Sequence, residues 1–314
     1  MGLRGLLTGA RAKQGRGNKQ DAVLDPFEGI EDAVPPPEAP HYQPGTWPID
    51  RLDVLEALWG RGNLIPGSHD FVAGLMNVCA LSSAKTMLDL GAGLGGASRA
   101  MVKKFGVWLV GLDREDILAS EANRRSLSRN MDKKAVFFAC DPETLRLKPS
   151  AYDAILCRQV LSTVQDKENL FNQLAEALKP SAHLVIYDFV QGAAKGHAEV
   201  LKTLWATEIP KMQLQRPQQI ANALKERNFL IHVAEDATAA YREMALGAWI
   251  AYCDALKPGT MKGLAAEVVL EECRRWVNRV AALDCGAVKV YRFHATNSSE
   301  KKKGSVATLS DWKY

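Results

Sequence analysis

Glycines crowd the segment Met87-Leu88-Asp89-Leu90-Gly91-Ala92-Gly93-Leu94-Gly95-Gly96, where an apolar run gives way to a helical pattern. Glycine permits a tight turn and lets a ligand approach the backbone, and a helix N-terminus offers unpaired N–H groups. The spacing of Gly91, Gly93 and Gly96 also satisfies the GxGxxG pattern of dinucleotide-binding loops. The loop alone therefore predicts a nucleoside ligand, without separating a nicotinamide cofactor from another nucleoside.

Three acidic residues narrow the choice of ligand. Asp113 ends an apolar run about twenty residues beyond the loop, where a carboxylate can accept hydrogen bonds from both ribose hydroxyls. Asp141 follows the run Phe137-Phe138-Ala139-Cys140, and Asp89 stands two residues before the first glycine, placed to meet an ammonium group. Any one of these acids could instead be a helix N-cap or a turn residue. Their joint position at one edge of the expected sheet favours a binding role.

A sheet is needed to bring these residues together. Between Lys85 and about Asp188 the chain alternates short apolar runs with helical stretches, which calls for right-handed crossovers and a parallel sheet covered on both faces. Ligands of such folds lie at the carboxyl ends of the strands. We expect the strands at residues 86–90, 108–112, 135–139, 154–157, 183–189, 229–234 and 287–293.

Apolar residues at helical spacing surround these strands. Two early helices, near residues 49–58 and 70–79, flank the loop from Gly60 to Gly67. Two late helices separate the last two strands and would form a cap on the sheet. We expect the remaining helices at residues 96–105, 115–130, 167–178 and 217–227, and the late pair at 238–255 and 263–283.

The two ends of the chain differ in composition from its middle. The first residues are basic, and seven of the fourteen prolines then fall between Pro26 and Pro48. Such a stretch cannot bury enough apolar surface to fold. We predict a disordered leader at residues 1–45, one domain at 46–297 with a helical insertion at 238–284, and a flexible tail at 298–314.

The overall composition is that of an ordinary folded protein. Hydrophobic residues make up 47% of the 314 and charged residues 24%, which excludes a wholly disordered or collagen-like chain. The net charge of +4 is too small to indicate a dedicated nucleic-acid binder. Six cysteines without a CxxC pair, and the absence of an apolar signal or membrane span, predict a reduced, cytoplasmic protein. A mitochondrial presequence within residues 1–19 is the alternative.

From residue 47 to about residue 297 the sequence resembles the class I S-adenosylmethionine-dependent methyltransferases, with Asp89 to Gly95 as the DxGxGxG motif of that family. The resemblance implies a Rossmann-like α/β fold: seven mostly parallel strands with an antiparallel last strand, helices on both faces and a helical cap. It makes Asp113 the ribose acid and Asp141 the partner of the adenine amino group. Nicotinamide enzymes, the alternative, predict no acid at Asp141. The implied contacts with S-adenosylmethionine come from Ile65, Asp89, Gly91, Gly93, Gly95, Asp113, Arg114, Asp141, Pro142 and Cys157.

A narrower resemblance rests on two segments. Residues 58–68, Leu-Trp-Gly-Arg-Gly-Asn-Leu-Ile-Pro-Gly-Ser, look like the lid loop of phosphoethanolamine and sarcosine or dimethylglycine N-methyltransferases. Residues 157–167, Cys-Arg-Gln-Val-Leu-Ser-Thr-Val-Gln-Asp-Lys, look like the phosphoethanolamine-group motif S-R-D-x-I-L-H-I-x-D-K. Gln159 stands where that group has Asp, and Thr163 where it has His. These departures argue against a phosphobase acceptor.

These features predict methyl transfer from S-adenosylmethionine to a small-molecule acceptor, either an amine or a hydroxylated metabolite. The reaction is an in-line displacement at an activated carbon, so it needs positioning and removal of a proton more than catalytic machinery. His69, after the lid loop, is the candidate proton acceptor, and Arg158 is expected at the methionine end of the cofactor as a ligand or in an ion pair. No metal site, nucleic-acid partner or membrane span is expected. The alternatives are an RNA or protein methyltransferase and a catalytically silent interaction module.

Overall fold

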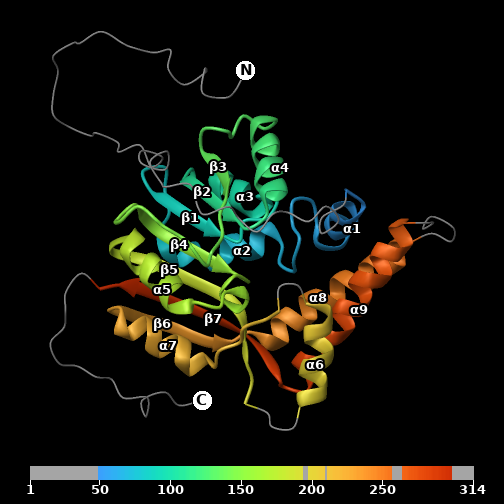
Figure 1. The fold of residues 1–314 in the computed structure, drawn as a ribbon. Coiled ribbons are helices and arrows are strands. Elements are labelled where there is room, and N and C mark those ends of the chain that lie inside the picture. The colour runs from blue at the N-terminus through green and yellow to red at the C-terminus, as the bar shows by residue number, and fades with distance from the viewer. Residues whose placement is uncertain (1–48, 194–196, 209–210, 257–263, 299–314) are drawn as a thin grey trace, which may run out of the picture.

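The computed structural model describes residues 49–193, 197–208, 211–256 and 264–298, and it contains a seven-stranded sheet with helices on both faces (Figure 1). The strands follow the order β3-β2-β1-β4-β5-β7-β6. Neighbours from β3 to β5 pair in parallel, whereas β7 is antiparallel to both β5 and β6. The predicted Rossmann-like sheet with an antiparallel last strand is confirmed. The strands are β1 (Thr86–Leu90), β2 (Trp108–Asp113), β3 (Ala135–Ala139), β4 (Tyr152–Arg158), β5 (Leu178–Gln191), β6 (Phe229–Asp236) and β7 (Val288–Asn297).

Two layers of apolar side chains cover the sheet, one on each face. Strand β5 shows why: Val185, Tyr187 and Phe189 join one layer, and Leu184 and Ile186 join the other. Central parallel strands are buried on both sides, which explains their nearly continuous apolar sequences. The first layer packs under α1 (Ile49–Trp59), α2 (His69–Leu75), α3 (Gly96–Phe105) and α4 (Asp116–Leu127), and the second under α5 (Lys167–Ala177) and α7 (Pro217–Glu226).

The predicted cap consists of α8 (Thr238–Ala255) and α9 (Leu264–Asp284), which lie between β6 and β7 in the sequence. A further helix, α6 (Ala198–Thr207), packs against α9 and was not predicted. These three helices and α1 gather at one end of the sheet (Figure 1). The cap therefore approaches the sheet from the side on which α1 lies.

Several element ends differ from the predicted ones. The expected strand at 183–189 begins earlier, because Leu178 pairs with Tyr152 before the register breaks and resumes at Ala154 and His183. The expected helix at 70–79 ends at Leu75, and a 3-10 turn follows at Asn77–Cys79. The predicted leader at 1–45 and all but the first residue of the predicted tail at 298–314 lie outside the described residues.

None of the helices in the described ranges is long and apolar enough to span a membrane. All six cysteines are free thiols.

Three histidines meet on the antiparallel part of the sheet. Nδ1 of His183 on β5 lies 3.0 Å from Nε2 of His294 on β7, and the ring of His232 on β6 lies 5.0 Å from that of His294. Burial, followed by the charges of His183, His232 and Arg292, lowers the pKa of His294 to about 4. The pKa of His183 is also lowered, by burial, then by His232 and Lys85. His294 is therefore neutral in the folded protein at pH 7.

We expect this cluster to make the protein less stable in mild acid. Between pH 6.5 and about 4 the unfolded chain binds a proton at His294 that the folded chain does not, so the free energy of unfolding falls as the pH falls. Replacing His294 with Gln should reduce the loss between pH 7 and pH 5 by about 1 to 2 kcal/mol. Urea unfolding at the two pH values measures the effect, with His197→Gln at the start of α6 as the control. An equal loss in wild type and His294→Gln would contradict it.

Candidate active site

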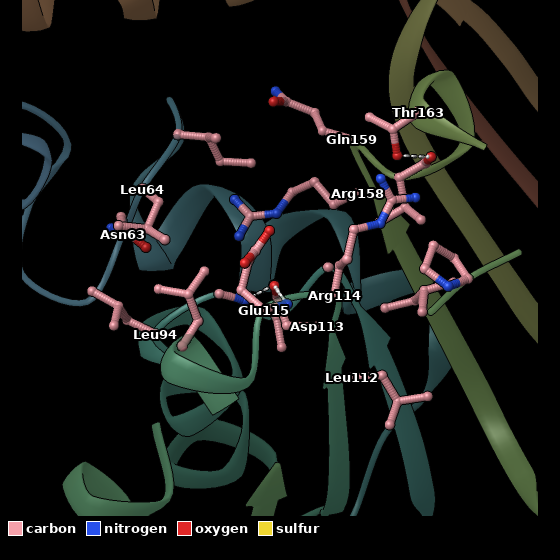
Figure 2. Close-up of a pocket in the computed structure, with 18 of the residues that line it drawn as sticks. Asn63, Leu64, Leu94, Leu112, Asp113, Arg114, Glu115, Arg158, Gln159 and Thr163 are labelled. Carbon is pink, nitrogen blue, oxygen red and sulfur yellow. Dashed lines mark hydrogen bonds between the residues drawn. The ribbon is translucent and has the colours of Figure 1, made fainter. Parts of the chain in front are cut away.

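A cavity of about 230 Å³ opens at the carboxyl ends of β1, β2 and β4 (Figure 2). This is the edge at which open α/β sheets bind ligands. The loop between α1 and α2 forms one wall, and the segments that follow β2 and β4 form the others. The lining also includes α1 and the segments that follow β1 and β3, and its residues include Arg51, Asn63, Leu64, Ile65, Gly91, Gly93, Leu94, Asp113, Arg114, Glu115, Cys140, Pro142, Arg158, Gln159, Val160 and Thr163.

The backbone conformation of the glycine loop requires residues without a side chain at positions 91 and 95. Gly91 has a φ of +84°, and a Cβ there would lie 2.7 Å from the carbonyl oxygen of Arg158. Gly95 has a φ of +68°, and a Cβ there would collide with the ring of Phe137. The N–H of Gly96, at the start of α3, donates to the carbonyl of Gly62 at 3.1 Å. The lid loop is thus bonded to the helix start that follows the glycine loop.

Asp113 faces the cavity from the end of β2. Its Oδ2 accepts the N–H of Gly93 at 2.7 Å, and its Oδ1 accepts the N–H of Glu115 at 3.1 Å (Figure 2). Burial raises the pKa of Asp113 to about 6, against the lowering effect of these two bonds. Each carboxylate oxygen has further lone pairs, so the fixed carboxylate can also accept from two neighbouring hydroxyls.

Asp89 and Arg158 are opposite charges buried on neighbouring strands, β1 and β4. Oδ2 of Asp89 accepts the hydroxyl of Ser98 at 2.5 Å, but its Oδ1 has no partner among the described residues. Nε and Nη1 of Arg158 likewise lack a partner there. Burial raises the pKa of Asp89 and lowers that of Arg158, and each charge opposes the shift of the other. Buried charged groups with free hydrogen-bonding positions are costly unless a ligand completes them.

The other predicted cofactor residues divide into three sets. Ile65, Arg114 and Pro142 line the cavity, together with Gly91, Gly93, Asp113 and Arg158. Gly95, Asp89 and Cys157 lie behind its wall, and burial raises the pKa of the Cys157 thiol. Asp141 borders an adjoining groove with Arg114 and Thr163, and its Oδ1 accepts the N–H of Glu143 at 3.0 Å.

His69 lies at the start of α2 and does not line the cavity. Its Nε2 is buried without a partner in the described part of the chain, and a Cβ on Gly96 would lie 2.7 Å from it. Burial lowers the pKa of His69, and the nearby charges of Arg99 and Arg158 lower it further. The imidazole is therefore neutral at pH 7 and can accept a proton. Its role as the acceptor's base remains a prediction.

Gln159 links the cavity wall to the cap. It has a φ of +55°, unusual for a residue with a side chain, and its Nε2 donates to the hydroxyl of Tyr241 on α8 at 2.8 Å. Its backbone N–H donates to the carbonyl of Tyr187. This contact could not be predicted from the sequence, because 82 residues separate Gln159 from Tyr241. Asn63 and Leu64, two further wall residues, lie in the lid loop that the sequence did single out.

Within the described ranges, no group of three or more His, Cys, Asp or Glu side chains is arranged to hold a metal ion.

A family model described as a methyltransferase domain matches residues 69–232, just over half of the chain. Phosphoethanolamine N-methyltransferase 2 of Caenorhabditis elegans is 24% identical over 196 residues, 62% of this chain and 44% of that protein. A sterol 24-C-methyltransferase of Schizosaccharomyces pombe is 26% identical over 158 residues, 48% of this chain and 41% of that protein. The chain thus spans less than half the length of either relative.

Solved structures share the fold. Phosphoethanolamine N-methyltransferase 2 of Haemonchus contortus, in complex with S-adenosyl-L-methionine, superposes with a TM-score of 0.71 at 19% identity, covering 79% of this chain and 57% of that one. A putative sarcosine dimethylglycine methyltransferase from Galdieria sulphuraria superposes with a TM-score of 0.67 at 15% identity, covering 79% of this chain and 98% of that one.

Proposed function

This chain belongs to the methyltransferase domain family, and on that premise we propose that it transfers a methyl group from S-adenosylmethionine to a small-molecule acceptor. The relatives named above act on small molecules according to their names, and one solved neighbour holds the cofactor. The reducing, cytoplasmic setting predicted from the sequence remains part of this proposal.

The distribution of charge along the cavity carries this proposal. S-adenosylmethionine has a ribose at its centre and an ammonium and a carboxylate group at its methionine end. Asp113 offers carboxylate oxygens for the ribose, while Arg158 and the Asp89 behind it offer one charge of each sign for the amino-acid group. Oδ1 of Asp89 and Nε and Nη1 of Arg158 have no partner among the described residues. They can bind the ammonium and the carboxylate of the amino-acid group, which would otherwise have no hydrogen-bond partners in an apolar site. A nicotinamide dinucleotide has no amino-acid group to meet this pair.

In this proposal the protein positions the methyl donor and keeps water from it. When bound, the cofactor supplies an electrophilic methyl group on a sulfonium. The backbone N–H of Gly93 fixes the Asp113 carboxylate, and the guanidinium of Arg158 would hold the methionine end of the cofactor. Gln159 and Thr163 line the same cavity. A neutral His69 is the candidate to take up the proton of the acceptor.

Calorimetric titration with S-adenosylmethionine tests the cofactor, and transfer of a labelled methyl group to a panel of acceptors tests the reaction. A folded protein that does not bind the cofactor would contradict the proposal and favour a silent interaction module. Tight binding of a nicotinamide dinucleotide would also contradict the proposal, and would show that the glycine loop binds a nicotinamide cofactor.

Phosphoethanolamine should be a poor acceptor, with turnover at least tenfold below that of the best uncharged compound in the panel. A protonated amine needs a carboxylate nearby and a base for its proton. Gln159 offers only a neutral amide, already bonded to Tyr241, and the Thr163 hydroxyl donates to the carbonyl of Val160 at 2.8 Å. The panel should therefore contain phosphobases, glycine derivatives and phenols. Efficient methylation of phosphoethanolamine would show this interpretation of Gln159 and Thr163 to be wrong.

A further inference from the structure

The lid loop, Gly60 to Gly67, is bonded to its surroundings through Gly62. The N–H of Gly62 donates to Oε1 of Glu56 on α1 at 2.5 Å, and its carbonyl accepts the N–H of Gly96 at 3.1 Å. Gly62 has a φ of +86°, and a Cβ there would lie 2.8 Å from Cα of Gly96. The middle of the loop is therefore held between α1 and the start of α3.

Arg125 on α4 fixes the carboxylate that receives Gly62. Its Nη1 and Nη2 donate to Oε1 and Oε2 of Glu56 at 2.5 and 3.0 Å, and its Nε donates to Glu121 at 2.6 Å. Both side chains of the Glu56–Arg125 pair are 15% exposed. Burial would raise the pKa of Glu56, but the hydrogen bonds from Arg125 and from the N–H of Gly62 hold it below its ordinary value. A bidentate bond of this kind is specific in geometry, so it orients the Glu56 carboxylate towards the loop.

The lid loop needs an anchor because its backbone contains three glycines with positive φ angles, Gly60, Gly62 and Gly67. Glycine loses more conformational freedom than any other residue when it is ordered, so this loop is costly to hold in one conformation. Residues 62–65 line the cofactor cavity, and Figure 2 shows Asn63 and Leu64 on one side of it. A loop that moved away would open this wall of the cavity.

We propose that Glu56 and Arg125 are positioning residues that hold the lid loop against the cavity and set how long S-adenosylmethionine stays bound. Neither side chain lines the cavity. Arg125 acts through Glu56, and Glu56 acts through the N–H of Gly62. Loops that close over a ligand often limit its release. This inference rests on the proposed function, and it adds two residues, 69 positions apart in the sequence, that control the cofactor site from outside it.

Hydrogen exchange of the ligand-free protein, read by mass spectrometry, tests whether the pair holds the loop. In Glu56→Ala the amides of residues 60–67 should exchange at least about tenfold faster, while those of β1, β2 and β4 keep their wild-type rates. Glu56→Gln keeps an oxygen for Gly62 but loses the charge that binds Arg125, so its exchange should be intermediate. Asp53→Ala is the matched control, because it removes an exposed acid one turn earlier on α1 and should leave residues 60–67 unchanged.

The association and dissociation rates of labelled S-adenosylhomocysteine test the effect on the cofactor site. Glu56→Ala and Arg125→Ala should each raise the dissociation rate about five- to twentyfold and change the association rate less than threefold. The double variant should release the ligand no faster than Glu56→Ala, because Arg125 acts through Glu56. Arg124→Ala is the control for the second substitution, since Arg124 is 69% exposed and pairs with Glu121. It should leave both rates unchanged.

The outcomes separate this inference from the proposed function. Unchanged exchange of residues 60–67 in Glu56→Ala, wild-type dissociation rates in both single variants, or additive effects in the double variant would overturn the inference. Faster exchange throughout the sheet would also overturn it, because it would indicate a general loss of stability. Failure of the wild type to bind S-adenosylhomocysteine would instead contradict the proposed function, and exchange in the ligand-free protein would still decide whether the pair holds the loop. Where a melting temperature shows that an alanine variant has unfolded, Glu56→Gln and Arg125→Lys carry the same comparisons.

Discussion

Replacing Arg158 with methionine should weaken S-adenosylmethionine binding by at least about thirtyfold. The guanidinium is buried, lines the cavity and keeps two nitrogen atoms without a partner among the described residues. Methionine fills a similar volume but cannot bind a carboxylate. Losing one partner of a buried, hydrogen-bonded charge pair costs about 2 to 5 kcal/mol, which corresponds to a loss of this size.

A ligand without the amino-acid group separates this role from a general effect on the site. 5′-Methylthioadenosine retains the adenosine part of the cofactor and lacks the group that Arg158 would bind. The arginine variant should therefore bind S-adenosylhomocysteine far more weakly than wild type does, while 5′-methylthioadenosine affinity changes less than threefold, about 0.6 kcal/mol. Calorimetry on the same preparations gives both values. A parallel loss for the two ligands would show that Arg158 supports the fold of the site and does not bind the methionine end.

Two variants control for the charge left behind. Without Arg158, the carboxylate of Asp89 is buried with only Ser98 as a side-chain partner, which destabilises the folded state. Arg158→Lys keeps a positive charge but loses the planar fork, so it should retain part of the affinity. Combining Asp89→Asn with Arg158→Met removes both charges and should recover melting temperature without recovering cofactor affinity.

Replacing Asp113 with alanine should weaken cofactor binding ten- to a hundredfold, about 1.5 to 3 kcal/mol, because the ribose would lose its charged acceptor. The wild-type affinity should also depend on pH. Asp113 has a pKa of about 6, and ribose hydroxyls bind its ionised form, so affinity should fall as the pH drops through 6, by up to tenfold per unit below it. Asp113→Asn should remove most of this dependence.

Asp116→Ala provides the matched control, because it removes an exposed carboxylate from the first turn of α4, three residues along the chain. Unchanged affinity in a folded Asp113→Ala protein, or the same pH profile in Asp113→Asn and wild type, would show that this carboxylate does not contact the ribose.

The sheet could be predicted because strands that are buried on both faces have a recognisable apolar sequence pattern. Strands such as β4 are nearly continuous apolar runs, and turn residues separate them from helices. Helix α6 was not predicted, although its apolar residues recur at helical spacing; among those described only Leu204 is buried, and the helix packs mainly against α9. The early start of β5 was missed because Pro180 and Ser181 read as a loop, and the register does break at that point.

The candidate site was predictable where it depends on position along one strand or loop. The glycine loop and Asp113 follow from the end of a strand, and both border the cavity. The sequence could not show that Nε and Nη1 of Arg158 have no partner among the described residues, or that Gln159 is bonded to Tyr241. Both depend on how the cap packs against the sheet. The same limit applies to His69. Its place after the lid loop was clear from the sequence, but the position of its Nε2 against Gly96 was not.

The insertion of β7 between β5 and β6 also shapes how a newly made chain can reach this structure. Synthesis proceeds from the N-terminus, and β1 to β5 can pair with one another as soon as they have emerged. Strand β6 emerges before β7 and then has no neighbouring strand, since in the sheet it pairs only with β7. Until β7 arrives, β5 also presents an unpaired edge, to which other chains can add. The last of the described strands to be synthesised thus closes the sheet, and the nascent protein is exposed to aggregation until β7 has followed the helical cap.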